Sequence, residues 1–131
     1  RNNIGENAFV NACHGGHTDV VQMLLDHSER IEVNTRDIFG MTAFLIACQY
    51  GHRDVVKLLL DHSGRIELNA ISNTRRNAFI LACGNGHKDV VQLLLDNSEK
   101  IKLNENDEET AFFEASDNGH KDIAEMLNHD E

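Results

Sequence analysis

The sequence lacks proline and tryptophan altogether, and aromatic residues make up only 5% of its 131 residues. Long apolar runs are also missing: the longest, such as residues 44–48, have four to six residues, whereas a membrane-spanning helix needs about 20. Positive charge is scarce, because 12 lysines and arginines face 22 aspartates and glutamates, for a net charge of −10. Phosphate backbones and anionic headgroups repel such a chain, so we expect no nucleic-acid partner and no membrane partner.

Apolar residues make up 40% of the chain, which is enough to form the core of one ordinary domain. The three cysteines cannot all pair with one another, and unpaired thiols suit a reducing compartment. We therefore expect an intracellular, cytoplasmic protein. The first residue is arginine and no charged-then-apolar leader follows it, so we expect the chain to be an excised segment.

One pattern recurs four times along the chain. Gly-His pairs occupy residues 16–17, 51–52, 86–87 and 119–120, at spacings of 35, 35 and 33. The sequence around each pair also aligns, as with TAFLIAC at 42–48 and DVVKLLL at 54–60 in the second repeat. Internal repeats of this length indicate a stack of similar units. We divide the chain into repeats at 1–35, 36–70 and 71–105 and a shortened capping repeat at 106–131.

Each repeat predicts two short helices. The first follows an Asn or Thr that we expect to cap its N-terminus, namely Asn7, Thr42, Asn77 or Thr110. The second follows Gly-His and carries its apolar residues on one wide face. Neither helix is long enough to be stable alone, so the repeats must stack into an all-α solenoid with one shared core. Turn-like and alternating segments at 37–40 and 63–69 predict hairpin-like connections between repeats.

These motifs resemble those of the ankyrin-repeat family. TAFLIA at 42–47 stands where the family has T-P-L-H-x-A, GH follows at 51–52, and IELN at 66–69 is similar to the family's ADVN segment. The resemblance implies stacked helix-turn-helix units. Alanine replaces the family's proline in every repeat, and apolar residues replace its histidine, from which we expect packing between repeats; they are Val10, Leu45, Ile80 and Phe113. Arg75 stands where the second repeat has Gly40, and a positive φ there would strain it.

The cysteines and most of the histidines, which could serve in catalysis or metal binding, recur with the repeats. This recurrence favours a structural role for them. Cys13, Cys48 and Cys83 lie 35 residues apart, and helices packed about 8–10 Å apart are too distant for a disulfide, so we expect buried, unpaired core residues. Four of the eight histidines belong to the Gly-His pairs and are predicted to order the turn between helices. No metal-ligand spacing, nucleophile elbow or phosphate loop is present, so we predict no metal, no cofactor and no enzymatic activity.

Positions that differ between repeats are free to recognise a partner. The resemblance implies that the turn tips, at 3–6, 38–41, 73–76 and 107–109, and the ends of the first helices line one concave surface. There the second repeat presents large apolar residues of the kind that anchor interfaces, although Phe39 or Met41 packing on a neighbouring turn is an open alternative. We predict that the partner-binding residues are Ile38, Phe39, Met41, Gln49, Tyr50, Thr74, Arg75, Arg76 and Asn85, with the two arginines fixing register by charge.

We therefore predict a monomeric, non-catalytic protein–protein interaction module that binds a partner protein or peptide. One alternative is an inert spacer, or an engineered repeat scaffold with no partner. Another is a nucleotide site in which Tyr50 stacks on a base and Arg76 holds a phosphate.

Two features of the chain each allow two interpretations. Residues 101–131 carry 2 basic against 10 acidic residues, which suits either a solvated cap or the steering of a basic partner. Asn34, Asn69 and Asn104 match the hairpin asparagine that hydroxylases modify in some ankyrin repeats; the alternative is a purely conformational role in the turn.

Overall fold

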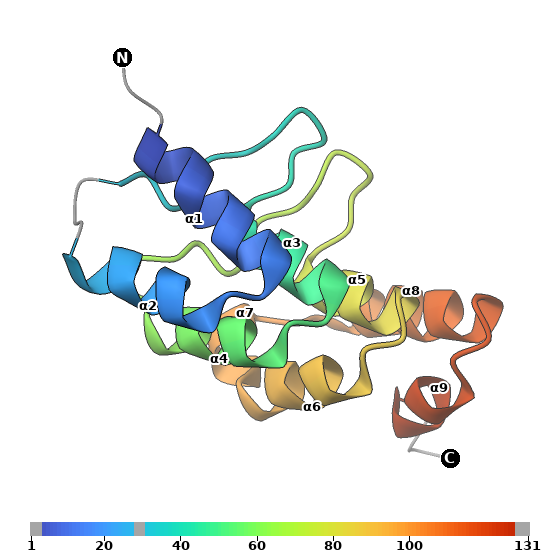
Figure 1. Cartoon of the computed structure of the whole chain (residues 1–131). Helices are drawn as coiled ribbons and strands as arrows, with labels where there is room; N and C mark the ends of the chain where they lie inside the picture. The colour runs from blue at the N-terminus through green and yellow to red at the C-terminus, as the bar shows by residue number, and fades with distance from the viewer. Residues whose placement is uncertain (1–3, 28–30, 128–131) are drawn as a thin grey trace.

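The computed structural model describes residues 4–27 and 31–127, with the backbone alone for residues 4–7. Over these residues the chain forms nine helices: α1 (Ile4–Gly15), α2 (Thr18–His27), α3 (Ala43–Tyr50), α4 (Arg53–Asp61), α5 (Ala78–Gly84), α6 (Lys88–Asp96), α7 (Ser98–Ile101), α8 (Glu105–Asp117) and α9 (Lys121–Leu127). Helices α1, α3, α5 and α8 lie side by side in one layer, and α2, α4, α6 and α9 form a second layer (Figure 1). The predicted all-α solenoid is confirmed.

Polar side chains cap the first helices of the two central repeats. The Thr42 hydroxyl accepts a hydrogen bond from the backbone N–H of Leu45 at 3.2 Å, and the Asn77 side chain accepts one from Ile80 at 2.9 Å. Each side chain satisfies one of the free N–H groups of the first turn. These two predicted caps are confirmed, whereas Asn7 and Thr110 lie inside α1 and α8 rather than at their N-termini.

The connections into the central repeats end in a tight turn held by a side-chain oxygen. Asp37 Oδ1 accepts from the N–H groups of Phe39 at 2.8 Å and Met41 at 2.9 Å. Ser72, 35 residues later, does the same for Arg76 at 3.3 Å. The two turns lie side by side and project from the first-helix layer (Figure 1).

The first and fourth repeats have no such turn within the described residues. In the fourth repeat the connection is two residues shorter, since Asn104 and Thr110 are six positions apart whereas Asn69 and Asn77 are eight apart, and α8 begins directly after Asn104. Asn104 caps that helix in a reciprocal capping box with Asp107. The predicted turn tip at 107–109 is therefore helical. The tip predicted at 3–6 is also wrong, because α1 begins at Ile4; residue 3 lies outside the described residues.

The residue two positions before the first-helix cap adopts a left-handed backbone in both turns. Gly40 has φ 76° and Arg75 has φ 66°. Glycine takes this conformation freely, but in other residues the Cβ atom crowds the following carbonyl oxygen. The strain at Arg75 was expected from the sequence. The turn keeps this conformation because the Ser72 hydroxyl accepts hydrogen bonds from the N–H groups of Thr74 and Arg76, on either side of Arg75.

Replacing Arg75 with glycine should therefore raise the free energy of unfolding. Relief of the left-handed strain is worth about 1–2 kcal/mol, and the greater freedom of glycine in the unfolded chain takes back about 0.4–1 kcal/mol, which leaves a net gain of about 0.5–1 kcal/mol. Urea unfolding followed by circular dichroism measures this. Thr74→Gly, in the same turn at a residue without a positive φ, should lose stability. A loss in both variants would contradict the strain at Arg75.

The core lies between the two helix layers and includes the three cysteines. Cys13, Cys48 and Cys83 are buried and unbridged, as the repeat spacing predicts. Burial raises the pKa of the Cys13 thiol to about 12. It also raises the pKa of Cys83 to about 12, with a smaller contribution from the nearby Glu114 carboxylate, and it raises the pKa of Cys48. These thiols are therefore protonated and unreactive in the folded protein.

The Gly-His histidines connect neighbouring repeats. His52 donates from Nε2 to the carbonyl oxygen of His14 at 2.8 Å, and His87 donates to that of Gln49 at 2.7 Å. Each bond satisfies a carbonyl near the end of the preceding repeat's first helix. The imidazoles thus have the structural role that the sequence predicts, acting between repeats as well as in the turn.

The apolar residues in the family's histidine position behave differently along the stack. Leu45 and Ile80 have a repeat on each side and are buried, and Val10 is partly buried, so packing between repeats is confirmed for them. Phe113 is 72% exposed, and there the prediction is wrong. Its helix is the last first-layer helix of the described stack, and no further helix packs on its outer side.

Candidate binding groove

An open groove of about 640 Å³ crosses the first-helix layer. The two turns form one wall and the ends of the first helices form the other, so the groove spans the second, third and fourth repeats and reaches His14 of the first. The turn residues that line it are Asp37, Phe39, Met41, Ser72, Thr74 and Arg76. The helix residues that line it are His14, Ile46, Gln49, Tyr50, Leu81, Gly84, Asn85, Glu114 and Asn118.

Two aromatic side chains stand at the end of the groove nearest the first repeat. Phe39 is 65% exposed and Tyr50 is 49% exposed. The His14 ring lies 4.6 Å from the Tyr50 ring between centroids and is tilted by 59°. This contact restricts Tyr50 and leaves both rings available to a partner.

Met41 departs from the prediction of an exposed anchor. It is only 8% exposed and belongs to the buried core, because the turn folds it back against the helices. The open alternative of packing therefore holds for Met41, which forms part of the groove wall. Phe39, two residues earlier, remains exposed on the opposite side of the turn.

The groove brings together seven of the nine residues predicted to bind a partner: Phe39, Met41, Gln49, Tyr50, Thr74, Arg76 and Asn85. The other two, Ile38 and Arg75, lie outside its lining at the tips of the turns and are exposed.

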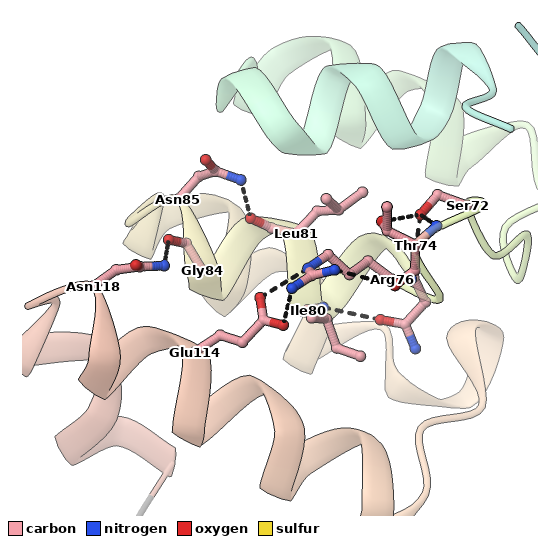
Figure 2. Close-up of polar contacts among 10 residues, drawn as sticks. Ser72, Thr74, Arg76, Ile80, Leu81, Gly84, Asn85, Glu114 and Asn118 are labelled. Atoms are coloured by element: carbon pink, nitrogen blue, oxygen red, sulfur yellow. Dashed lines mark hydrogen bonds and ion pairs between the residues drawn. The ribbon is translucent and has the colours of Figure 1, made fainter. Parts of the chain in front are cut away.

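Arg76 is committed to an ion pair across the groove floor. Its Nη2 lies 2.7 Å from Glu114 Oε2 and its Nε donates to Glu114 Oε1 at 3.1 Å, while Nη1 donates to the Thr74 carbonyl at 3.1 Å (Figure 2). Such a two-point contact is the stronger form of an arginine–carboxylate pair. It joins the turn of the third repeat to α8. A phosphate approaching Arg76 would meet the Glu114 carboxylate, so the pair disfavours the nucleotide alternative.

Two asparagines line the same wall at equivalent positions. Asn85 donates from Nδ2 to the Leu81 carbonyl at 2.8 Å, and Asn118 donates to the Gly84 carbonyl at 2.8 Å (Figure 2). In the fourth repeat Asn118 thus gives the inter-repeat hydrogen bond that histidines give earlier in the stack. Each NH2 group uses one of its two N–H donors within the protein, so the amide oxygen and the second N–H are left for a ligand.

The predicted partner-binding residues do not include His14, Glu114 and Asn118, although His14 and Asn118 belong to the first-helix ends expected on the concave surface. The repeat alignment contains the signal for two of them, since Asn118 aligns with Tyr50 and Asn85, and His14 aligns with Gln49. Glu114 aligns with the buried Ile46 and Leu81. A carboxylate at a position that is apolar in the two central repeats indicates a basic partner. That signal could have pointed to Arg76.

The three asparagines discussed for hydroxylation all have conformational roles. Asn34 donates to the Arg65 carbonyl at 3.0 Å and Asn69 donates to the Lys100 carbonyl at 3.3 Å, each linking one inter-repeat connection to the next. Asn104 caps α8. Hydroxylation of these residues stays a prediction.

Across residues 4–27 and 31–127, no three histidine, cysteine, aspartate or glutamate side chains converge on a point where they could hold a metal ion. None of the described helices has the length and apolar character needed to span a bilayer.

The stacked helix pairs and the groove across them define a helical repeat protein. The family model for ankyrin repeats (3 copies) matches residues 1–72 and 65–131. The chain therefore belongs to the ankyrin-repeat family. No curated protein was found to match it.

Proposed function

We propose that the chain is a non-catalytic module that holds a partner protein in the groove, anchored on Phe39 and Tyr50. Ankyrin repeats are in general protein–protein interaction modules. The observation that carries the proposal is the exposure of these two aromatic side chains, 65% and 49%, on the wall of one groove. Aromatic residues that become desolvated at the centre of an interface contribute most of its affinity. They recur nowhere else in the repeat pattern, so stacking does not require them.

Affinity capture with the purified chain as bait tests this proposal. Phe39→Ala combined with Tyr50→Ala should lose about tenfold or more of a captured partner, measured by quantitative mass spectrometry, because each anchor contributes about 1–2 kcal/mol or more. The helical circular dichroism and the melting temperature should remain nearly unchanged. Phe113→Ala is the matched control, since it removes an equally exposed phenyl ring outside the groove.

The same experiment separates the proposal from the inert-spacer alternative. A spacer captures nothing that depends on the two aromatic residues, even at high bait concentration. Equal capture by the wild type and the double variant would move the binding surface away from the groove.

A further inference from the structure

The two ends of the groove differ in chemistry. The end formed by the second repeat is aromatic, with Phe39 and Tyr50 exposed above the buried Met41. The end formed by the third and fourth repeats is lined by Asn85, Glu114 and Asn118. A ligand that fills the groove must therefore be apolar at one end and polar at the other.

The polar end offers free hydrogen-bond acceptors, and about half of its side-chain donors are already engaged within the protein. The amide groups of Asn85 and Asn118 donate to backbone carbonyls of α5, and Arg76 donates to Glu114 and Thr74. Figure 2 shows the Asn85 amide oxygen turned away from Leu81. What remains free at this end is the two amide oxygens, the second N–H of each amide and the unused lone pairs of the Glu114 carboxylate. A donor-rich ligand group matches the free acceptors.

The charge at this end is also negative. The charges of Arg76 and Glu114 offset each other in their ion pair. Asp117 precedes Asn118 in the chain, just outside the groove lining; it is exposed and has no ion-pair partner in the part of the chain that the structure describes. The C-termini of α5 and α8 lie here as well, and the negative end of a helix dipole favours a cation. The group that fits is a lysine or arginine side chain.

The polar side chains along the groove suit an extended ligand backbone. Gln49, Asn85 and Asn118 supply one amide per repeat, and the Gln49 amide has no hydrogen-bond partner within residues 4–27 and 31–127. An extended segment has free N–H and C=O groups to meet these amides, whereas a helix satisfies its own. Tyr50 and Asn118 are two helix spacings apart, about 16–20 Å, which about five or six extended residues span.

We propose that the groove binds an extended peptide segment with a large apolar side chain and, about five or six residues away, a lysine or arginine. The apolar side chain sits between Phe39 and Tyr50. The basic side chain sits among Asn85, Asn118 and Asp117. The inference rests on the proposed function and adds the chemistry of the partner.

Selection of a phage-displayed random 12-residue peptide library on the immobilised full chain tests this. Recovered peptides should combine a large apolar residue with Lys or Arg at the stated spacing. A fluorescent synthetic copy of one should bind about tenfold more weakly when either residue is replaced by alanine. Asp117→Asn should weaken its binding about three- to tenfold in low salt, measured by fluorescence polarisation. Asp122→Asn, which makes the same change in net charge on α9, should have little effect.

The possible failures are distinguishable. Peptides that require Phe39 and Tyr50 but carry no basic residue, or that bind the Asp117→Asn protein equally well, would overturn this inference and leave the proposed function standing. Recovery of only helical peptides, or of no peptide, would also overturn it. The proposed function itself fails only if the aromatic double variant captures partner proteins as well as the wild type does.

Discussion

Replacing Phe44 with alanine should lower the free energy of unfolding by about 3–5 kcal/mol, a large part of the about 5–15 kcal/mol that stabilises a typical domain. Phe44 is fully buried in α3, between the first-helix and second-helix layers. Removing its ring loses the free energy gained by burying that apolar surface. It also leaves a cavity that the close-packed neighbours fill only in part. Because α3 contacts both α1 and α5, the loss weakens the stack on both sides.

Denaturant unfolding followed by circular dichroism at 222 nm measures the effect. Phe113→Ala is the control, because Phe113 lies one position later in the aligned repeat but is exposed, and its loss should change stability by less than about 0.5 kcal/mol. Similar losses in the two variants would show that Phe113 is covered in solution or that Phe44 is not part of the core.

Gly51→Ala should lower the free energy of unfolding by about 2–4 kcal/mol. Gly51 ends α3 with φ 75°, a conformation in which a side chain is strained. An added Cβ would also overlap the imidazole of His87, which is fixed by its hydrogen bond to the Gln49 carbonyl. The ring cannot move aside without breaking that bond.

Thermal and urea unfolding of four variants test this prediction. Gly64→Ala is the matched control, because Gly64 has no positive φ and nothing within 4 Å of an added Cβ, so stability should stay the same or rise slightly. In the Gly51→Ala background, His87→Ala should cost less than it does in the wild type, because it removes the overlap. Equal melting of the Gly51→Ala and Gly64→Ala proteins would refute the close contact.

The repetition in the sequence was enough to predict the helix pairs, the stack and the buried cysteines. Burial recurs with the repeat because each unit needs the same contacts with its neighbours. The starts of the second helices, directly after Gly-His, were predictable in every repeat, whereas the starts of the first helices were predictable only in the central repeats, where Thr42 and Asn77 cap α3 and α5. In the fourth repeat the connection is two residues shorter, and α8 begins at Glu105, five residues before the expected cap Thr110.

The groove was predictable in position and less so in detail. Seven of the nine predicted residues line it because turn tips and helix ends converge once the repeats stack. The burial of Met41 depends on how the turn folds back, and the pairing of Arg76 with Glu114 joins residues 38 positions apart. Neither follows from periodicity, since both depend on three-dimensional contacts that occur once in the chain.

No single repeat contains the groove, which forms only where several repeats stack. Tyr50, Asn85 and Asn118 come from three successive units, and the ion pair between Arg76 and Glu114 keeps the last of them in place. A ligand that touches all three binds only when the units are docked, so its binding free energy adds to the cohesion of the array. Occupancy should therefore suppress fraying of the C-terminal unit, and a truncation that removes α8 and α9 should abolish recognition even if the remaining repeats stay folded.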